Sequence, residues 1–241
     1  MHTYAFKRLR RVLMASAALV CVASYAEATV IDLTFEGINA TYPSTNYASI
    51  ENFYNGGTSS QGTSGPDYGI GFSSNALAIC LNTPGNTCSN TSKGGLGDPN
   101  SQKGALFFLS GAQTFMNVAA GFSTGFSFNH ANINDVGSVT VWSGLSGTGT
   151  LLATLSIPTT VSNCPPSYSA GFCPFVADGI AFSGIAESVS FAGVENQIVF
   201  DDVTFGSVTP GPVPEPSSLA MLGAALFGLR ALRRHRRRAN T

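Results

Sequence analysis

Carboxylates interrupt two apolar stretches of the sequence. Asp32 and Glu36 lie among apolar residues near the start of the chain, and Asp201 and Asp202 follow the apolar run 198–200. A buried carboxylate without a compensating charge is costly, and calcium offsets that cost by taking about six to eight oxygen ligands. We predict that Glu36, Asp201 and Asp202 bind a structural calcium ion if these segments are neighbouring strands. Alternatively the carboxylates cap strand ends in water, since strand alternation turns at least one of Asp201 and Asp202 outward.

The cysteines indicate disulfides rather than a metal centre. Besides Cys21 near the N-terminus, the chain holds four cysteines, which permit three connectivities: Cys80, Cys88, Cys164 and Cys173. Each of the two local pairs, Cys80 with Cys88 and Cys164 with Cys173, brackets a turn-rich loop, and we predict this pairing. Zinc is the rival interpretation, but the sequence has no CxxC spacing.

The sequence offers little for catalysis. His130 is the one histidine outside the terminal segments, so a Ser/His/Asp device has a single candidate base. No phosphate-binding Gly-Lys-Ser/Thr loop is present. Paired carboxylates that hydrolyse glycosides remain an alternative, with these acids available: Glu36, Glu51, Asp67 and Glu195. We predict a protein that is not an enzyme.

Several aromatic residues have flat rings that can stack on sugar faces. We take Tyr54, Tyr68 and Trp142 as candidates for glycan contact, because asparagines and Asp67 accompany the tyrosines and can orient a ligand. The alternative for Trp142 is that it covers the face of a sheet.

The two ends of the chain read as processing segments. Residues 1–28 combine four basic residues, an apolar run and small residues at a cleavage site, which predicts a secretory signal peptide. At the other end, Pro214, Glu215 and Pro216 precede an apolar stretch from Leu219 to Leu229 and a tail with five arginines. This stretch is short for a hydrocarbon core of about 30 Å, and the arginines keep the tail on the cytoplasmic side.

Setting these ends aside changes the charge of what remains. The whole chain has a formal net charge of −1, but residues 29–210 hold eleven acidic residues and only two lysines, a formal charge of −9. An acidic domain repels phosphate backbones, so we predict no nucleic-acid partner.

The domain between these ends is predicted to be all-β. Apolar residues alternate with period two between turn-rich segments, and no amphipathic helix of three turns emerges. We expect one antiparallel sandwich of jelly-roll type over residues 29–210, followed by the sorting and transmembrane segment 211–241. The expected strands are Val30 to Phe35, Ile70 to Leu81, Ala105 to Leu109, Met116 to Phe128, Ser138 to Trp142, Thr150 to Ile157, Ala177 to Phe182, Ser188 to Phe191 and Gln197 to Phe205.

Side-chain parity then assigns inner faces to these strands. Phe122, Phe126 and Phe128 share parity within the expected strand Met116 to Phe128. A second set is expected to line an inner face as well, namely Leu151, Ala153, Leu155 and Ile157.

The tail resembles the PEP-CTERM sorting signal of Gram-negative bacteria on the Pro214-Glu215-Pro216 triplet, the apolar stretch and the arginine cluster. That resemblance implies export across the inner membrane, a transient membrane-held intermediate and removal of the tail by an exosortase-type protease. Interior segments such as Gly65 to Phe72 and Ile198 to Phe205 are similar to a group of PEP-CTERM surface proteins. The first and last strands also resemble jelly-roll carbohydrate-binding modules, in which such acids often bind structural calcium.

Two classes of function follow. The first is a non-enzymatic surface or extracellular-matrix protein that binds exopolysaccharide in a biofilm, as the association of PEP-CTERM systems with such polymers implies. The second is a secreted glycan-active hydrolase on the same scaffold.

Overall fold

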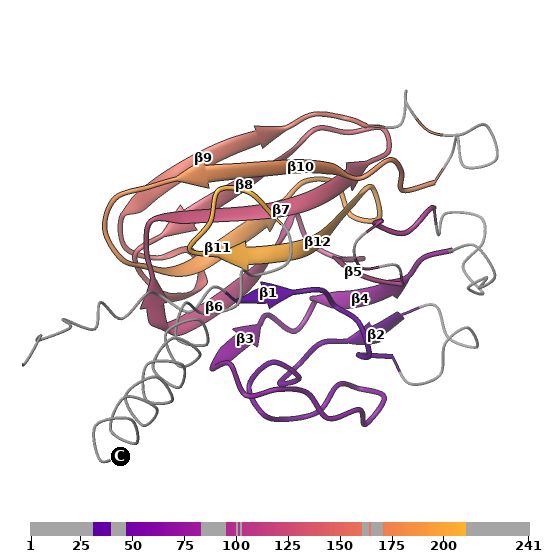
Figure 1. Ribbon diagram of the computed structural model, residues 1–241, viewed down its shortest axis with the longest axis horizontal. Coiled ribbons are helices and arrows are strands. Elements are labelled where there is room, and N and C mark those ends of the chain that lie inside the picture. The colour runs from indigo at the N-terminus through magenta and orange to yellow at the C-terminus, as the bar shows by residue number, and fades with distance from the viewer. Residues whose placement is uncertain are drawn as a thin grey trace, which may run out of the picture.

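The protein folds into two antiparallel β-sheets that pack face to face, in a computed structural model that describes residues 31–39, 47–82, 95–99, 101, 103–160, 164 and 171–210. This confirms the predicted antiparallel sandwich of jelly-roll type (Figure 1). Within these ranges the one helical element is the 3₁₀ turn η1 (Leu145–Gly147). None of the described segments is a helix long and apolar enough to cross a membrane. The predicted signal peptide and the sorting segment 211–241 lie outside the described residues.

The larger sheet runs in the order β10-β7-β12-β5-β4-β2, with β1 also paired to β12. In chain order its strands are β1 (Asp32–Leu33), β2 (Tyr47–Ser49), β4 (Leu77–Cys80), β5 (Gly104–Phe107), β7 (Gly125–Asn132), β10 (Val176–Ala181) and β12 (Ile198–Phe205). The smaller sheet runs in the order β3-β6-β11-β8-β9. Its strands are β3 (Ile70–Phe72), β6 (Gln113–Phe122), β8 (Gly137–Trp142), β9 (Leu151–Ile157) and β11 (Ala186–Ala192).

The first and last strands lie side by side, as the calcium hypothesis requires. Asp32 faces Thr204 and Leu33 faces Val203 across the β1–β12 ladder. In Figure 1 the short indigo and purple strands β1 to β4 gather along one side of the molecule, beside the longer strands of the later sequence. Chain closure therefore brings the two predicted acidic segments onto adjacent strands.

Two segments predicted as single strands are each two strands in different sheets. Ile70 to Leu81 breaks into β3 and β4 at a turn in which the Ala76 N–H donates to the carbonyl of Ser73 at 2.9 Å. The Asn75 side-chain amide fixes this turn by donating to the carbonyls of Ser110 and Gln113. This polar turn lets the chain cross from one sheet to the other, and the apolar alternation alone does not reveal it.

The segment Met116 to Phe128 breaks in the same way, into β6 and β7. Gly121 and Thr124 both have positive φ, at 73° and 76°, so the chain bends there and leaves the sheet. The parity prediction still holds in effect, because Phe122 and Phe126 contact each other at 6.0 Å between ring centroids, and Phe126 contacts Phe128 at 5.7 Å. The rings meet in the core between the sheets.

The inner-face prediction for β9 is wrong at one residue. Leu151 is 47% exposed, whereas Leu152 packs against the core together with Ala153 and Leu155. The ladder with β8 shifts register here, since Val141 pairs with Ala153 but Trp142 pairs with Leu151. This irregularity exchanges the faces of the two leucines.

The central strands β5, β7 and β12 of the larger sheet are buried on both faces. Its inner face joins the main core through residues such as Phe128 and Phe200, while its outer face carries a second apolar cluster, a distinction that follows from strand alternation. The outer cluster comprises Ile79, Leu81, Ala105, Phe107, Ala131, Ile133, Phe172 and Val199. Phe172 comes from the loop before β10, so a long loop covers the outer face.

The predicted disulfide between Cys164 and Cys173 closes this covering loop, with the two Cα atoms 5.4 Å apart. The carbonyl of the neighbouring Phe172 accepts a hydrogen bond from the Leu96 N–H at 3.1 Å, which joins the loop to segment 95–99. Cys80 is also disulfide-bonded. Cys88 lies outside the described residues, so its pairing with Cys80 stays a prediction.

Candidate functional site

The outer face of the larger sheet holds a pair of buried carboxylates at a β-bulge. Asp201 pairs with Asn129 and Thr204 pairs with Ser127, so the β12–β7 ladder shifts register between them. Asp202 is the extra residue of the bulge, with a φ of 45°. Both aspartates are buried, at 0% and 1% exposure. The expectation that alternation would expose one of them is therefore wrong, because a bulge suspends the alternation.

One serine hydroxyl bridges the two carboxylates. Ser101 Oγ lies 2.8 Å from Asp201 Oδ2 and 2.8 Å from Asp202 Oδ1. Asn129 donates to the other oxygen of Asp202 at 3.0 Å, and the Asp202 N–H donates to Asp201 Oδ1 at 2.8 Å. A hydroxyl carries a single proton, so it cannot donate to both carboxylates at once. The arrangement is complete only when one carboxyl group is itself protonated or a cation compensates its charge.

Two more aspartates add to this negative charge, and we call Asp32, Asp98, Asp201 and Asp202 the acidic cluster. Burial raises the pKa of Asp32 from 3.8 to about 7, with further contributions from the charges of Asp202 and Asp98. Burial also raises the pKa of Asp201 well above its ordinary value, and Asp202 adds to that effect. Lys103 is the one Lys or Arg side chain in the described ranges, and it is exposed. The cluster therefore has a surplus of buried negative charge.

Glu36 does not join the acidic cluster in the way predicted. Its Oε1 accepts hydrogen bonds from the backbone N–H groups of Lys103 and Gly104, which links the turn after β1 to the start of β5. Within the described part of the chain no three His, Cys, Asp or Glu residues are grouped as a metal-ligating set. Glu36 thus has a structural role here, whereas Asp32 lies on β1 opposite Thr204 of β12 and is influenced by the charge of Asp202.

The donor chemistry of the acidic cluster suits a hard cation. Carboxylate, hydroxyl, amide and backbone oxygens are available, whereas nitrogen and sulfur ligands for zinc are not part of it. No sequence pattern predicts Asp98, Ser101 or Asn129 as part of the cluster, because Asp98 and Ser101 lie in a loop without periodicity and Asn129 is an ordinary polar residue of a strand. The one available signal is the adjacency of two acids in an otherwise mostly apolar strand.

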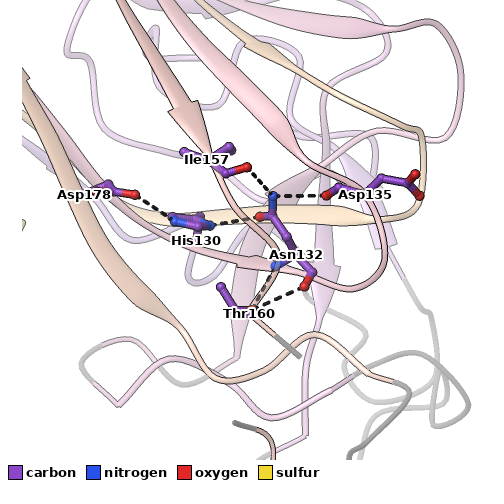
Figure 2. Close-up of polar contacts among 6 residues, drawn as sticks. All are labelled: His130, Asn132, Asp135, Ile157, Thr160 and Asp178. Atoms are coloured by element: carbon purple, nitrogen blue, oxygen red, sulfur yellow. Dashed lines mark hydrogen bonds and ion pairs between the residues drawn. The ribbon is translucent and has the colours of Figure 1, made fainter. Parts of the chain in front are cut away.

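A second buried polar cluster surrounds His130 (Figure 2). The ring Nδ1 lies 2.9 Å from Asn132 Oδ1, and Nε2 lies 3.0 Å from Asp178 Oδ2. The Asn132 side-chain amide donates to the carbonyls of Asp135 and Ile157, both at 3.4 Å. The Asn132 N–H in turn donates to Thr160 Oγ1 at 3.1 Å. This cluster joins β7 to β10, to the end of β9 and to the segment that follows it.

The three aromatic candidates lie in different environments. Tyr54 is 4% exposed, its hydroxyl accepts a hydrogen bond from the Phe35 N–H at 2.9 Å, and burial raises its pKa well above 10.0. It therefore has no ring face open to a ligand. Tyr68 is 43% exposed and stacks on Tyr54. Trp142 is half-buried at the end of β8, and its ring N–H donates to Thr140 Oγ1 at 2.8 Å.

Comparison with known proteins confirms the predicted sorting signal in the C-terminal tail. Residues 212–238 match the family described as the PEP-CTERM protein-sorting motif, and Pro214, Glu215 and Pro216 lie within this match. The motif implies an exported protein that is sorted at the membrane and processed by an exosortase-type protease. No curated protein matches the chain.

Three solved structures of carbohydrate-binding modules are similar to the chain at a low level. The structure of CsCBM6-3 from Clostridium stercorarium in complex with cellobiose has 20% identity and a TM-score of 0.32, over 54% of this chain and 81% of that one. A mutant of the family 29 module CBM29-2 has 12% identity and a TM-score of 0.32, over 58% and 98%. A second CBM29-2 mutant has 13% identity and a TM-score of 0.30, over 56% and 92%.

Proposed function

We propose that this chain is an exported, non-enzymatic protein of the cell surface or extracellular matrix that binds exopolysaccharide. The observation that carries the proposal is the sorting motif at residues 212–238, which directs the protein to the envelope. In this proposal the protein passes through an inner-membrane intermediate before an exosortase-type protease removes the tail. The β-sandwich is then displayed or released where exopolysaccharide accumulates.

The environment of the one described histidine supports a role without catalysis. His130 is 0% exposed, and both of its ring nitrogens are occupied, one by Asn132 and the other by Asp178. A general base needs a nitrogen within reach of a nucleophile or a substrate proton. His130 instead connects strands inside the sandwich.

We further propose that the acidic cluster takes up calcium as a structural ion. Asp201 and Asp202 would hold it, and its positive charge would offset their mutual repulsion and the nearby charge of Asp32. The raised pKa values of Asp32 and Asp201 and the shared hydroxyl of Ser101 support this proposal. Calcium would contribute to the stability of the folded domain.

Binding and hydrolysis can be separated in one experiment. The exported protein is incubated with exopolysaccharide from its own culture, and we measure both retention on the polymer and release of reducing ends. Retention without release is the expected result. Release that disappears on single carboxylate-to-amide substitutions would instead establish the alternative, a secreted glycan-active hydrolase.

The route to the surface has its own test. Deletion of the exosortase-type protease is expected to leave the protein in the membrane fraction at its unprocessed mass. Unchanged processing and release in the deletion strain would contradict the proposed sorting.

A further inference from the structure

The described chain begins and ends at the same end of the sandwich. β12 runs antiparallel to β7, so its last residue, Phe205, pairs with Phe126 near the start of β7. The Phe205 N–H donates to the carbonyl of Ile31 at 3.0 Å, which places the residue before β1 at this end as well. β10 also ends here, because Ala181 pairs with Gly125. We call this the exit end, at the left of Figure 1, and it comprises segments 121–125, 182–185 and 206–210.

Two of the most exposed aliphatic side chains lie at the exit end. Ile185 is 63% exposed and Val208 is 51% exposed. Both lie beside the turn that joins β6 to β7. A Cβ on Gly121 would lie 2.4 Å from the Ile185 side chain, and a Cβ on Gly125 would lie 2.9 Å from the Val208 side chain. The two glycines therefore let both aliphatic side chains lie close against one turn while much of their surface stays in solvent.

The exit end is also free of formal charge. Its three segments hold no Asp, Glu, Lys or Arg and consist of glycine, serine, threonine, proline, phenylalanine, isoleucine and valine. The first acids inward from this end on β1 and β11, Asp32 and Glu187, are half-buried. Residues 29–210 together have a formal charge of −9. The exit end is therefore a part of the domain that an anionic lipid surface repels little.

Short connections tether the exit end close to the membrane-directed segments. The predicted signal peptide ends at residue 28, three residues before Ile31. Eight residues, 211–218, separate Pro210 from the apolar stretch that begins at Leu219, and this connection spans at most about 30 Å when fully extended. While the tail is in the membrane, the exit end is thus held beside the lipid at a high effective concentration.

We propose that the exit end docks on the periplasmic leaflet of the inner membrane while the C-terminal tail is attached, with Ile185 and Val208 among the lipid headgroups. This inference rests on the proposed function, because it concerns the membrane-held intermediate. The apolar stretch Leu219 to Leu229 is short for a hydrocarbon core of about 30 Å, so the tail is a marginal span. Burial of two aliphatic side chains in the interface adds to its hold. Removal of the tail ends the tether and frees the domain.

Val194 provides a matched control at the opposite end of the sandwich. It follows β11 directly and is 46% exposed, so its surroundings also leave room for a larger side chain. Its neighbour Glu195 is an exposed acid, unlike any residue of the exit end. A reporter at Val194 should therefore stay in solvent when the exit end meets the lipid.

The test is quenching of tryptophan fluorescence by lipid. The chain with its tail is purified from cells that lack the exosortase-type protease and is reconstituted into vesicles of phosphatidylethanolamine and phosphatidylglycerol, with or without lipids brominated near the headgroup. Trp142→Phe removes the single tryptophan, and Ile185→Trp or Val194→Trp introduces one elsewhere. Brominated lipid should lower the fluorescence of the Ile185→Trp variant about twofold and that of the Val194→Trp variant by less than about a tenth.

Two checks accompany this measurement. The quenching should persist at high salt, where the Debye length is about 3 Å, because apolar insertion is not screened. Thermal melting shows that each variant is folded, and Val208→Trp serves if Ile185→Trp does not fold. Quenching that disappears at high salt would overturn the apolar contact.

The possible failures are distinct. Equal quenching of the Ile185→Trp and Val194→Trp variants overturns docking through the exit end, because it shows adsorption without a preferred orientation. Absence of quenching in a chain that floats with the vesicles overturns docking but leaves the membrane-held intermediate intact. A chain that does not float with the vesicles overturns the intermediate itself, and docking with it.

Contact of the exit end with another protein would also overturn the assignment to lipid. Shielding of the introduced tryptophan from iodide that grows with the ratio of protein to lipid, without quenching by brominated lipid, would show contact with a second copy of the chain. Shielding that requires membranes with the exosortase-type protease would show contact with that protein.

Discussion

The two buried polar clusters of the larger sheet differ in how their hydrogen-bonding groups match. Asn129 and His130 are neighbours on β7 and so point to opposite faces, the first into the acidic cluster and the second into the cluster of Figure 2. Around His130 both ring nitrogens face acceptors, Asn132 Oδ1 and Asp178 Oδ2, so both hydrogen bonds form when the ring carries two N–H groups, and the Asp178 carboxylate then offsets the positive charge. The Asn132 amide donates to two carbonyls. Around Asp201 and Asp202 one hydroxyl faces two carboxylates.

Burial alone therefore does not determine how the contribution of a polar cluster to stability responds to pH and cations. A cluster whose positive and negative charges offset each other, as those of a protonated His130 and Asp178 do, has no surplus negative charge to attract calcium, so its contribution to stability should be insensitive to calcium. A cluster with surplus charge must take up protons or a cation, and its contribution should follow pH and calcium. The His130 cluster links strands of the sandwich at any calcium concentration, whereas the contribution of the acidic cluster to stability depends on pH and calcium.

The largest effect is expected from His130→Ala. The substitution empties a fully buried volume and leaves Asn132 Oδ1 without its donor, which should lower the free energy of unfolding by about 3 kcal/mol. The melting temperature should fall by on the order of 10 °C, with and without calcium. Circular dichroism during thermal unfolding measures this.

Asn134→Ala is the control for that substitution. Asn134 is exposed and bonds to the side chain of Gln197 at 3.2 Å, so its loss should cost less than about 0.5 kcal/mol. A fall for His130→Ala that calcium reverses would mean that the two clusters are coupled and the comparison is wrong.

Calcium should have the next largest effect. At a free concentration about 100 times its dissociation constant, calcium should stabilise the wild-type protein by about 2.7 kcal/mol relative to EGTA. Asp201→Asn should abolish this response, whereas His130→Ala should keep it. Asp201→Asn should also leave the protein in EGTA as stable as the wild type or more so, because the amide replaces one buried charge without a change of shape. Melting temperatures unmoved by EGTA and by added calcium would argue against the ion.

The sequence predicted the architecture because its signals are local and repeated. Alternation located strands in all nine expected segments, and the pairing of β1 with β12 followed from chain closure. The polar turn at Ser73 and Asn75 and the bend between Gly121 and Thr124 were missed, because apolar residues continue the alternation on both sides of each break. Where one strand ends inside such a run is determined by contacts with distant residues such as Ser110.

The site was predictable only in part. Two adjacent acids in an apolar strand marked Asp201 and Asp202, but the bulge that buries both depends on the register with β7. The segment that brings Asp98 and Ser101 over them carries no pattern of its own. Glu36 shared the sequence context of a ligand, yet its carboxylate accepts hydrogen bonds from the backbone N–H groups of Lys103 and Gly104. Alternation predicts a strand at this point of the sequence but not that it lies beside Glu36.

The free energy of unfolding should also depend on pH, as a smaller effect, and should fall as the pH rises. The pKa of Asp32 is about 7 in the folded protein and 3.8 when unperturbed, so between about pH 4 and 7 the folded protein holds a proton that the unfolded chain has released. Stability in EGTA should therefore decrease as the pH rises through this interval. Because Asp32 is half-exposed, solvent screening limits the loss to roughly 1 to 2 kcal/mol.

Asp32→Asn isolates this contribution from the other titrating groups. Urea unfolding at pH 5 and pH 8 should give a smaller difference for Asp32→Asn than for the wild type. The same difference in both proteins would show that Asp32 does not contribute to the surplus of charge.

The smallest effects should come from the hydroxyl groups of the two clusters, and they test the comparison most directly. Thr160→Val removes the acceptor for the Asn132 N–H and should cost about 1 kcal/mol at both pH 5 and pH 8. Ser101→Ala should cost more at pH 8 than at pH 5, because the Ser101 hydroxyl lowers the pKa of Asp201 by donating to its ionised form. Urea unfolding of both variants in EGTA measures the two dependences. Equal costs of Ser101→Ala at the two pH values would contradict the comparison. They would mean that the Ser101 hydroxyl does not stabilise the ionised carboxylates, so that the acidic cluster behaves like the cluster around His130.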